Sequence, residues 1–116
     1  MSLTNTPVYY EEASDWLKIL DTLQQENVRL KNRIAEVIRM DVNGKTLDQA
    51  ELILSNIINK EAVIALLRRD IVQHIKETAN GNAELKQSKL REDIGKMQDE
   101  LKRLAAELAS YISTAA

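Results

Sequence analysis

Among the side chains that could take part in catalysis or metal binding, the chain has a single histidine. His74 is the only histidine of the chain, and cysteine is absent. Metal sites built on two or three histidines, thiolate metal sites and Ser-His or Cys-His nucleophilic pairs therefore lack their parts. We expect His74 to be a surface or edge residue of a helix, and disulfides play no part in stability.

Two short motifs partly resemble known reactive sites, and neither fits. A histidine phosphotransfer site resembles His-x-x-Lys-Gly, whereas the chain reads His-Ile-Lys-Glu-Thr from His74. The segment from Asn43 to Thr46 contains Gly-Lys-Thr, the end of a phosphate-binding loop, but the earlier glycine and a preceding strand are missing. The sequence thus predicts no catalytic residue, no metal, no cofactor and no enzymatic activity.

Three polar residues interrupt otherwise apolar heptad positions: Asn27, Glu61 and Arg68. The expected register places Asn27 level with Glu61 at mid-length, with Arg68 two turns from Glu61 on the same face. Polar residues at such positions commonly fix register and oligomeric state, which is the interpretation we favour. The alternatives are a buried group that binds a small ligand or handles protons, and a different register in which these side chains are solvated.

The pattern that positions these residues is a recurrence of apolar side chains in steps of four and three, which predicts three amphipathic helices. The last third has an unbroken seam consisting of Leu90, Ile94, Met97, Leu101, Leu104, Leu108 and Tyr111. The first third has a seam consisting of Tyr9, Ala13, Trp16, Leu20, Leu23, Asn27, Leu30, Ile34 and Val37. The middle third has a broader face along Ala50, Leu54, Ile57, Glu61, Ile64, Arg68, Ile71 and Ile75.

Helix boundaries follow from start and stop signals. Pro7 suits the first position of a helix, and Asn43-Gly44 suits a helix end because both residues tolerate a left-handed backbone. Thr46 opens a capping box, and Asn82 can cap the last helix. The predicted helices are about 7–41, 47–78 and 83–113.

These elements predict an all-α protein with one domain over residues 1–116. Phe is absent and Gly and Pro are scarce, so nothing supports a sheet. Links this short join antiparallel neighbours, which gives an up-down-up bundle of three long helices, a coiled-coil-like rod. The alternative is a bundle that completes its core only by dimerisation.

Charge and hydropathy limit the classes of partner. With 16 basic and 18 acidic residues, no strong electrostatic partner is expected, and nucleic acid is not predicted. The longest apolar run, Ala62 to Leu67, is far shorter than the roughly 20 residues that a membrane span needs. The first residues lack the pattern of a secretory signal, so we expect a cytoplasmic protein.

A candidate contact surface lies on the middle helix, where Leu52, Val63 and Leu66 point away from its main apolar face. Exposed apolar patches mark interaction sites, although a central helix can also use a wide apolar face internally. The sequence therefore favours a non-enzymatic scaffold, adaptor or assembly module that binds a protein partner or itself. The alternative function is a small-ligand-binding or catalytic bundle that uses Asn27, Glu61 and Arg68.

Overall fold

The computed structural model describes residues 6–40, 47–77 and 83–115, and all of them are helical. The helices are α1 (Thr6–Met40), α2 (Leu47–Glu77) and α3 (Ala83–Ala115). Their bounds agree with the predicted ranges to within two residues at each end. The proposed signals at Asn43-Gly44, Thr46 and Asn82 lie outside the described residues.

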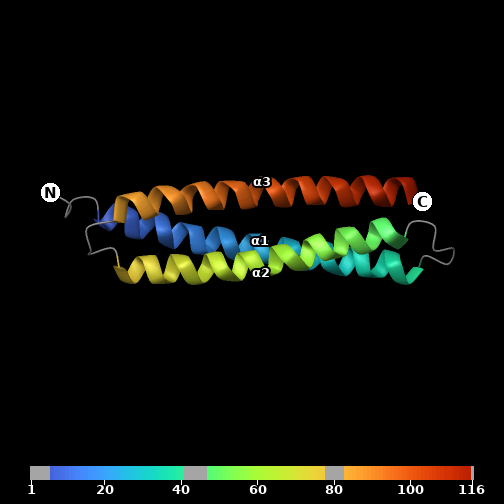
Figure 1. The fold of residues 1–116 in the computed structure, drawn as a ribbon, viewed down its shortest axis with the longest axis horizontal. Helices are drawn as coiled ribbons and strands as arrows, with labels where there is room; N and C mark the ends of the chain where they lie inside the picture. Colours follow the sequence, from blue (N-terminus) through green and yellow to red (C-terminus); the bar gives the residue numbers. More distant parts are fainter. Residues whose placement is uncertain (1–5, 41–46, 78–82, 116) are drawn as a thin grey trace.

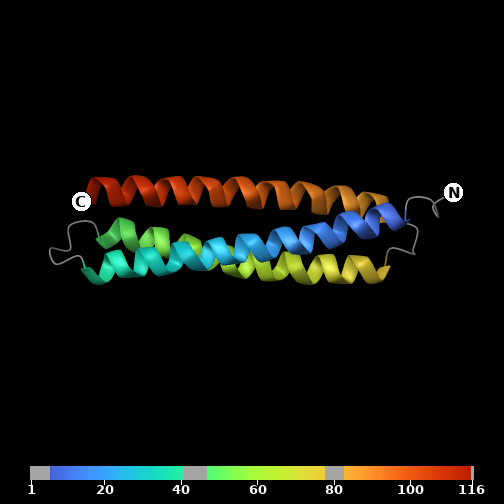
Figure 2. The ribbon, with the colours of Figure 1, turned by 180° about the vertical axis from the view of Figure 1, so that it is seen from behind.

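The three helices pack side by side as an antiparallel up-down-up bundle (Figures 1 and 2). Every pair of helices is in contact, and the molecule is a rod with extents of 64 × 18 × 18 Å. In both views α1 and α2 cross one another along the rod, while α3 runs along one side of the pair. The predicted all-α three-helix bundle is confirmed. None of the described helices is apolar enough over a sufficient length to cross a lipid bilayer.

The core lies along the rod axis and is built from the heptad seams. Every seam residue of α3 from Leu90 to Tyr111 is buried, as expected when a strict repeat of four and three keeps one edge of a helix against its neighbours. In α1 the seam is also inside, with Tyr9, Leu23 and Val37 only half-buried. The buried apolar residues of α1 are Ala13, Trp16, Leu20, Leu30 and Ile34.

The inner face of α2 differs from the predicted one. One column of its seam was predicted correctly and consists of Ala50, Ile57, Ile64 and Ile71. The second column is Ile53, Lys60, Leu67 and His74, not Leu54, Glu61, Arg68 and Ile75. The two candidates for this second column each contain polar residues, so the sequence pattern alone does not show which of them is buried. Lys60 is tolerated because its long side chain reaches out to Glu100 of α3, with 2.8 Å between Nζ and Oε2.

Contacts between helices fix their register. Lys31 of α1 pairs with Glu61 of α2 at 3.0 Å. His74 of α2 contacts Gln87 of α3 near one end of the bundle, whereas the pair of Lys60 and Glu100 lies nearer its middle. These pairs match the register expected from two short links, which put Asn27 level with Glu61 and Glu61 near Glu100.

Candidate functional site

The three polar residues expected at the centre of the bundle do not converge. Asn27 is buried, with 1% of its surface exposed, and its Nδ2 donates to the backbone carbonyl of Ile57 at 3.0 Å. The side chain of Glu61 is 46% exposed, and that of Arg68 is 34% exposed. The prediction of a polar core is therefore wrong for Glu61 and Arg68.

The physical reason is that α2 is rotated about its own axis relative to the orientation predicted from the sequence. With Ile53 and Leu67 turned inward, Glu61 and Arg68 lie on the flank of α2 that faces α1. There Glu61 pairs with Lys31, and Arg68 pairs with Asp21. Ion pairs at such exposed positions contribute about 0 to 1 kcal/mol each, so they orient the two helices more than they stabilise them.

A different buried polar group, which the sequence reasoning missed, joins all three helices at one end of the rod. His74 of α2 and Gln87 of α3 are each 1% exposed and are hydrogen-bonded through Nε2 and Oε1. The Gln87 amide Nε2 also donates to the backbone carbonyl of Tyr9 at 3.2 Å and to Glu12 Oε1 at 2.8 Å. The prediction that His74 is a surface or edge residue is wrong.

The partners of Gln87 determine where the protons lie. A carbonyl and a carboxylate can only accept, so the NH₂ group of Gln87 must face Tyr9 and Glu12. Its carbonyl oxygen then faces His74, which must carry a proton on Nε2 to donate to it. The amide of Gln87 thus uses its oxygen for α2 and its nitrogen for α1.

Glu12 connects this group to the surface. Its carboxylate accepts from Arg91 of α3 at two points, 2.9 Å from Nε to Oε2 and 2.7 Å from Nη2 to Oε1. The hydrogen bonds from Arg91 hold the pKa of Glu12 below its ordinary value of 4.5, and the bond from Gln87 acts in the same direction against partial desolvation. We refer to His74, Gln87, Glu12 and Arg91 as the end network.

The sequence does contain a signal for the end network. Gln87 lies three residues before Leu90, and His74 lies three residues after Ile71, so each continues a buried seam by one step. Polar residues at seam positions near the same turn are candidates for pairing across helices. Because its members are hydrogen-bonded to one another, the end network can hold the three helices in register. Its geometry fits a structural role.

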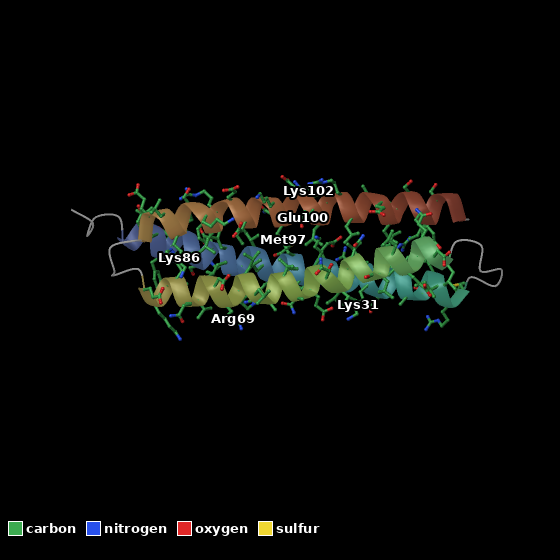
Figure 3. All side chains as sticks on the ribbon, in the orientation of Figure 1. Lys31, Arg69, Lys86, Met97, Glu100 and Lys102 are labelled. Atoms are coloured by element: carbon green, nitrogen blue, oxygen red, sulfur yellow. The ribbon has the colours of Figure 1, made fainter. Side chains whose placement is uncertain are left out.

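An open groove runs between α2 and α3 near mid-rod, with a volume of about 330 Å³. It is lined on α2 by Val63, Leu66, Leu67 and Asp70, and on α3 by Asp93, Lys96, Met97 and Glu100. Leu67 and Met97 are buried and form its floor, whereas Leu66 is 49% exposed. Figure 3 shows Met97 on the side of α3 that faces the other helices and Lys102 on the opposite side.

Two of the three residues predicted as a contact surface, Val63 and Leu66, line this groove. Val63 is half-buried against the core. Leu52 lies about three turns before Val63 on the same flank of α2 and is 60% exposed. We call these three side chains the α2 flank; they share one side of α2, with the exposed Asn59 between Leu52 and Leu66.

Neither metal chemistry nor similarity to known proteins adds to this description. Across residues 6–40, 47–77 and 83–115, no three acidic or histidine side chains come together where they could hold a metal ion. No protein-family model, no curated protein and no solved structure matches the chain.

Proposed function

We propose that this protein is a non-enzymatic helical scaffold or assembly module that acts through protein–protein contacts made by the α2 flank. The observation that carries the proposal is the exposure of Leu66, at 49%, in an open groove with an apolar floor. Leu52, which is 60% exposed, lies about four turns before it on the same side of α2. Exposed apolar side chains beside a groove with an apolar floor favour binding of another polypeptide.

The shape of the molecule supports the same function. A rod of 64 Å presents long helix faces that lie side by side, and a groove between two helices suits a third helix that inserts apolar side chains. The small-ligand alternative has less support, since it needs Asn27, Glu61 and Arg68 together. Those residues bond to three different partners, and none of them lines the groove.

Affinity capture with the intact protein tests the proposal. The double substitution Leu52→Lys and Leu66→Lys puts two charges on the α2 flank without changing a buried residue. Polypeptides that bind the wild type are expected to be lost from this variant and retained by Leu85→Lys, a control at a residue that is 77% exposed and does not line the groove. Equal circular dichroism spectra would show that all three proteins are folded. Identical captured sets from all three would contradict the proposal.

A further inference from the structure

One edge of α3 beside the groove carries charges of alternating sign. Lys89, Asp93, Lys96 and Glu100 follow in steps of four, three and four, so they share one side of the helix. Asp93, Lys96 and Glu100 line the groove itself. The side chains of Lys89 and Lys96 are 65% and 62% exposed, which leaves both ammonium groups accessible to a neighbour.

This order of charges is complementary to itself. If a second α3 lies antiparallel to the first, with a two-fold axis between Ile94 and Gly95, Lys89 faces Glu100 of the second copy. Asp93 then faces Lys96 of the second copy, and the symmetry repeats both pairs. A two-fold interface requires such self-complementarity, because the same surface is used by both molecules.

Leu66, one of the two exposed leucines of the α2 flank, lies at the height of that axis. The contacts of His74 with Gln87 and of Lys60 with Glu100 bracket the groove. Halfway between these two contacts, Leu66 and Leu67 of α2 are level with Ile94 of α3. A two-fold axis at the position that the charges require therefore also places Leu66 of one copy against Leu66 of the other.

The position along the rod also favours extensive contact. The point between Ile94 and Gly95 lies about 7 Å from the middle of α3, so two antiparallel rods would overlap over most of their length. Val63 lies beside Leu66 in the groove, and together with Val63 of the second copy it would extend the apolar contact on either side of the axis.

We propose that the groove between α2 and α3 is covered by a second copy of this chain, in an antiparallel two-fold dimer with Leu66 at the axis. The proposal rests on the proposed function and deepens it by naming the partner. Apolar contact around Leu66 supplies most of the affinity, while the reciprocal pairs of Lys89 with Glu100 and Asp93 with Lys96 select the antiparallel orientation.

Forming these pairs requires the exchange of intramolecular ion pairs that are only weakly stabilising. All of them lie at least partly exposed, where replacing one carboxylate partner by another costs little. The pairs exchanged are Lys89 with Asp93 at 3.1 Å and Lys96 with Glu92 at 3.4 Å. Glu100 keeps its pair with Lys60, at 2.8 Å, and accepts from Lys89 of the second copy as well.

Sedimentation equilibrium of the full chain, at concentrations up to about 1 mM, tests whether the dimer exists. The wild type is expected to dimerise. Leu66→Lys is expected to raise the dissociation constant about 100-fold, because two leucine contacts at the axis are lost at once. Val28→Lys, at a 45% exposed residue of α1 outside the proposed interface, is expected to leave it unchanged.

A charge swap tests the orientation. Lys96→Asp places a second carboxylate opposite Asp93 of the other copy at two points, which is expected to raise the dissociation constant about tenfold. Adding Asp93→Lys restores opposite charges at both points and is expected to return the constant close to its wild-type value. A parallel or unrelated dimer would not be rescued by this second substitution.

Two results would overturn the inference: a wild type that stays monomeric at every concentration, or a dimer that is insensitive to Leu66→Lys and to the charge swap. The proposed function fails separately. If the wild type is monomeric but still captures another polypeptide that the Leu52→Lys and Leu66→Lys variant loses, only the inference is wrong. If it is monomeric and capture is also unaffected, both are wrong.

Discussion

His74 of α2 donates a hydrogen bond from Nε2 to the side-chain carbonyl of Gln87 of α3, and both residues are almost completely buried. Neither group could be left alone there, because a buried polar group without a partner costs about 1 to 3 kcal/mol. Gln87 continues the connection to Tyr9 and Glu12, so one side chain links α2 and α3 to α1. The end network therefore holds the bundle closed at this end.

The first prediction concerns Gln87→Leu. The leucine fills the site but removes the acceptor for His74 and the donor for Glu12 and Tyr9. We expect the free energy of unfolding to fall by roughly 1 to 3 kcal/mol. Urea denaturation followed by the fluorescence of Trp16, the only tryptophan, measures the loss. Gln98→Leu is the control, since Gln98 is a half-buried glutamine of the same helix. A midpoint equal to that of the wild type would mean that the end network does not stabilise the fold.

The second prediction concerns the coupling of His74 and Gln87. Each single change to leucine leaves a buried polar partner unsatisfied, whereas changing both removes the two groups together. We expect the double variant to lose at least about 1 kcal/mol less than the sum of the single losses. The same denaturation experiment gives all four free energies. Additive losses would show that the two side chains do not depend on one another.

The third prediction concerns acid stability and Arg91. The hydrogen bonds of Arg91 lower the pKa of Glu12 in the folded protein below the ordinary value of 4.5. The resulting stabilisation is fully present above that value and is lost as the pH falls through the lowered pKa. Arg91→Met should therefore cost up to about 1 kcal/mol at neutral pH, since both side chains are partly exposed, and almost nothing once Glu12 is protonated.

Arg103→Met is the control for Arg91, because it also removes an exposed cation from α3. Unfolding free energies of both variants and the wild type are compared at neutral pH and well below the ordinary glutamate pKa of 4.5. The difference between the two variants should be present at neutral pH and disappear in acid. A difference that grows on acidification would contradict the role assigned to Glu12. The carboxyl of Glu77, whose pKa is also lowered by Gln73 and by Lys86, remains in all three proteins.

The fold could be predicted from the sequence for two reasons. The apolar seams run along the whole length of each helix, and the short links allow only antiparallel neighbours. A single seam residue such as Leu101 is one of many that indicate the same face of α3, so local ambiguity does not matter there. In α2 the two possible columns are equally polar, with Glu61 and Arg68 in one and Lys60 and His74 in the other. Which column is buried depends on how α2 is rotated against both neighbours, and that is a property of the assembled bundle.

The end network could not be derived from periodicity for a related reason. Seam spacing marks Gln87 and His74 as inward, but it does not say that the two meet or that Glu12 lies within reach. Those facts depend on the relative heights of three helices. The α2 flank could be predicted more easily, because Leu52 and Leu66 lie away from the buried face of α2 whichever of the two columns is turned inward.

The last prediction concerns Asn27, whose Nδ2 is bonded to the carbonyl of Ile57 while its buried Oδ1 has no hydrogen-bond partner. Burial of that oxygen costs about 1 to 3 kcal/mol, whereas the single bond contributes about 1 kcal/mol. Asn27→Leu should therefore raise the free energy of unfolding by about 1 kcal/mol while loosening the register that the polar residue fixes. Glu61→Leu, level with it but exposed, should change stability by less than about 1 kcal/mol. Denaturation and sedimentation measure both effects, and an Asn27→Leu protein that is clearly less stable would show that the amide stabilises the core.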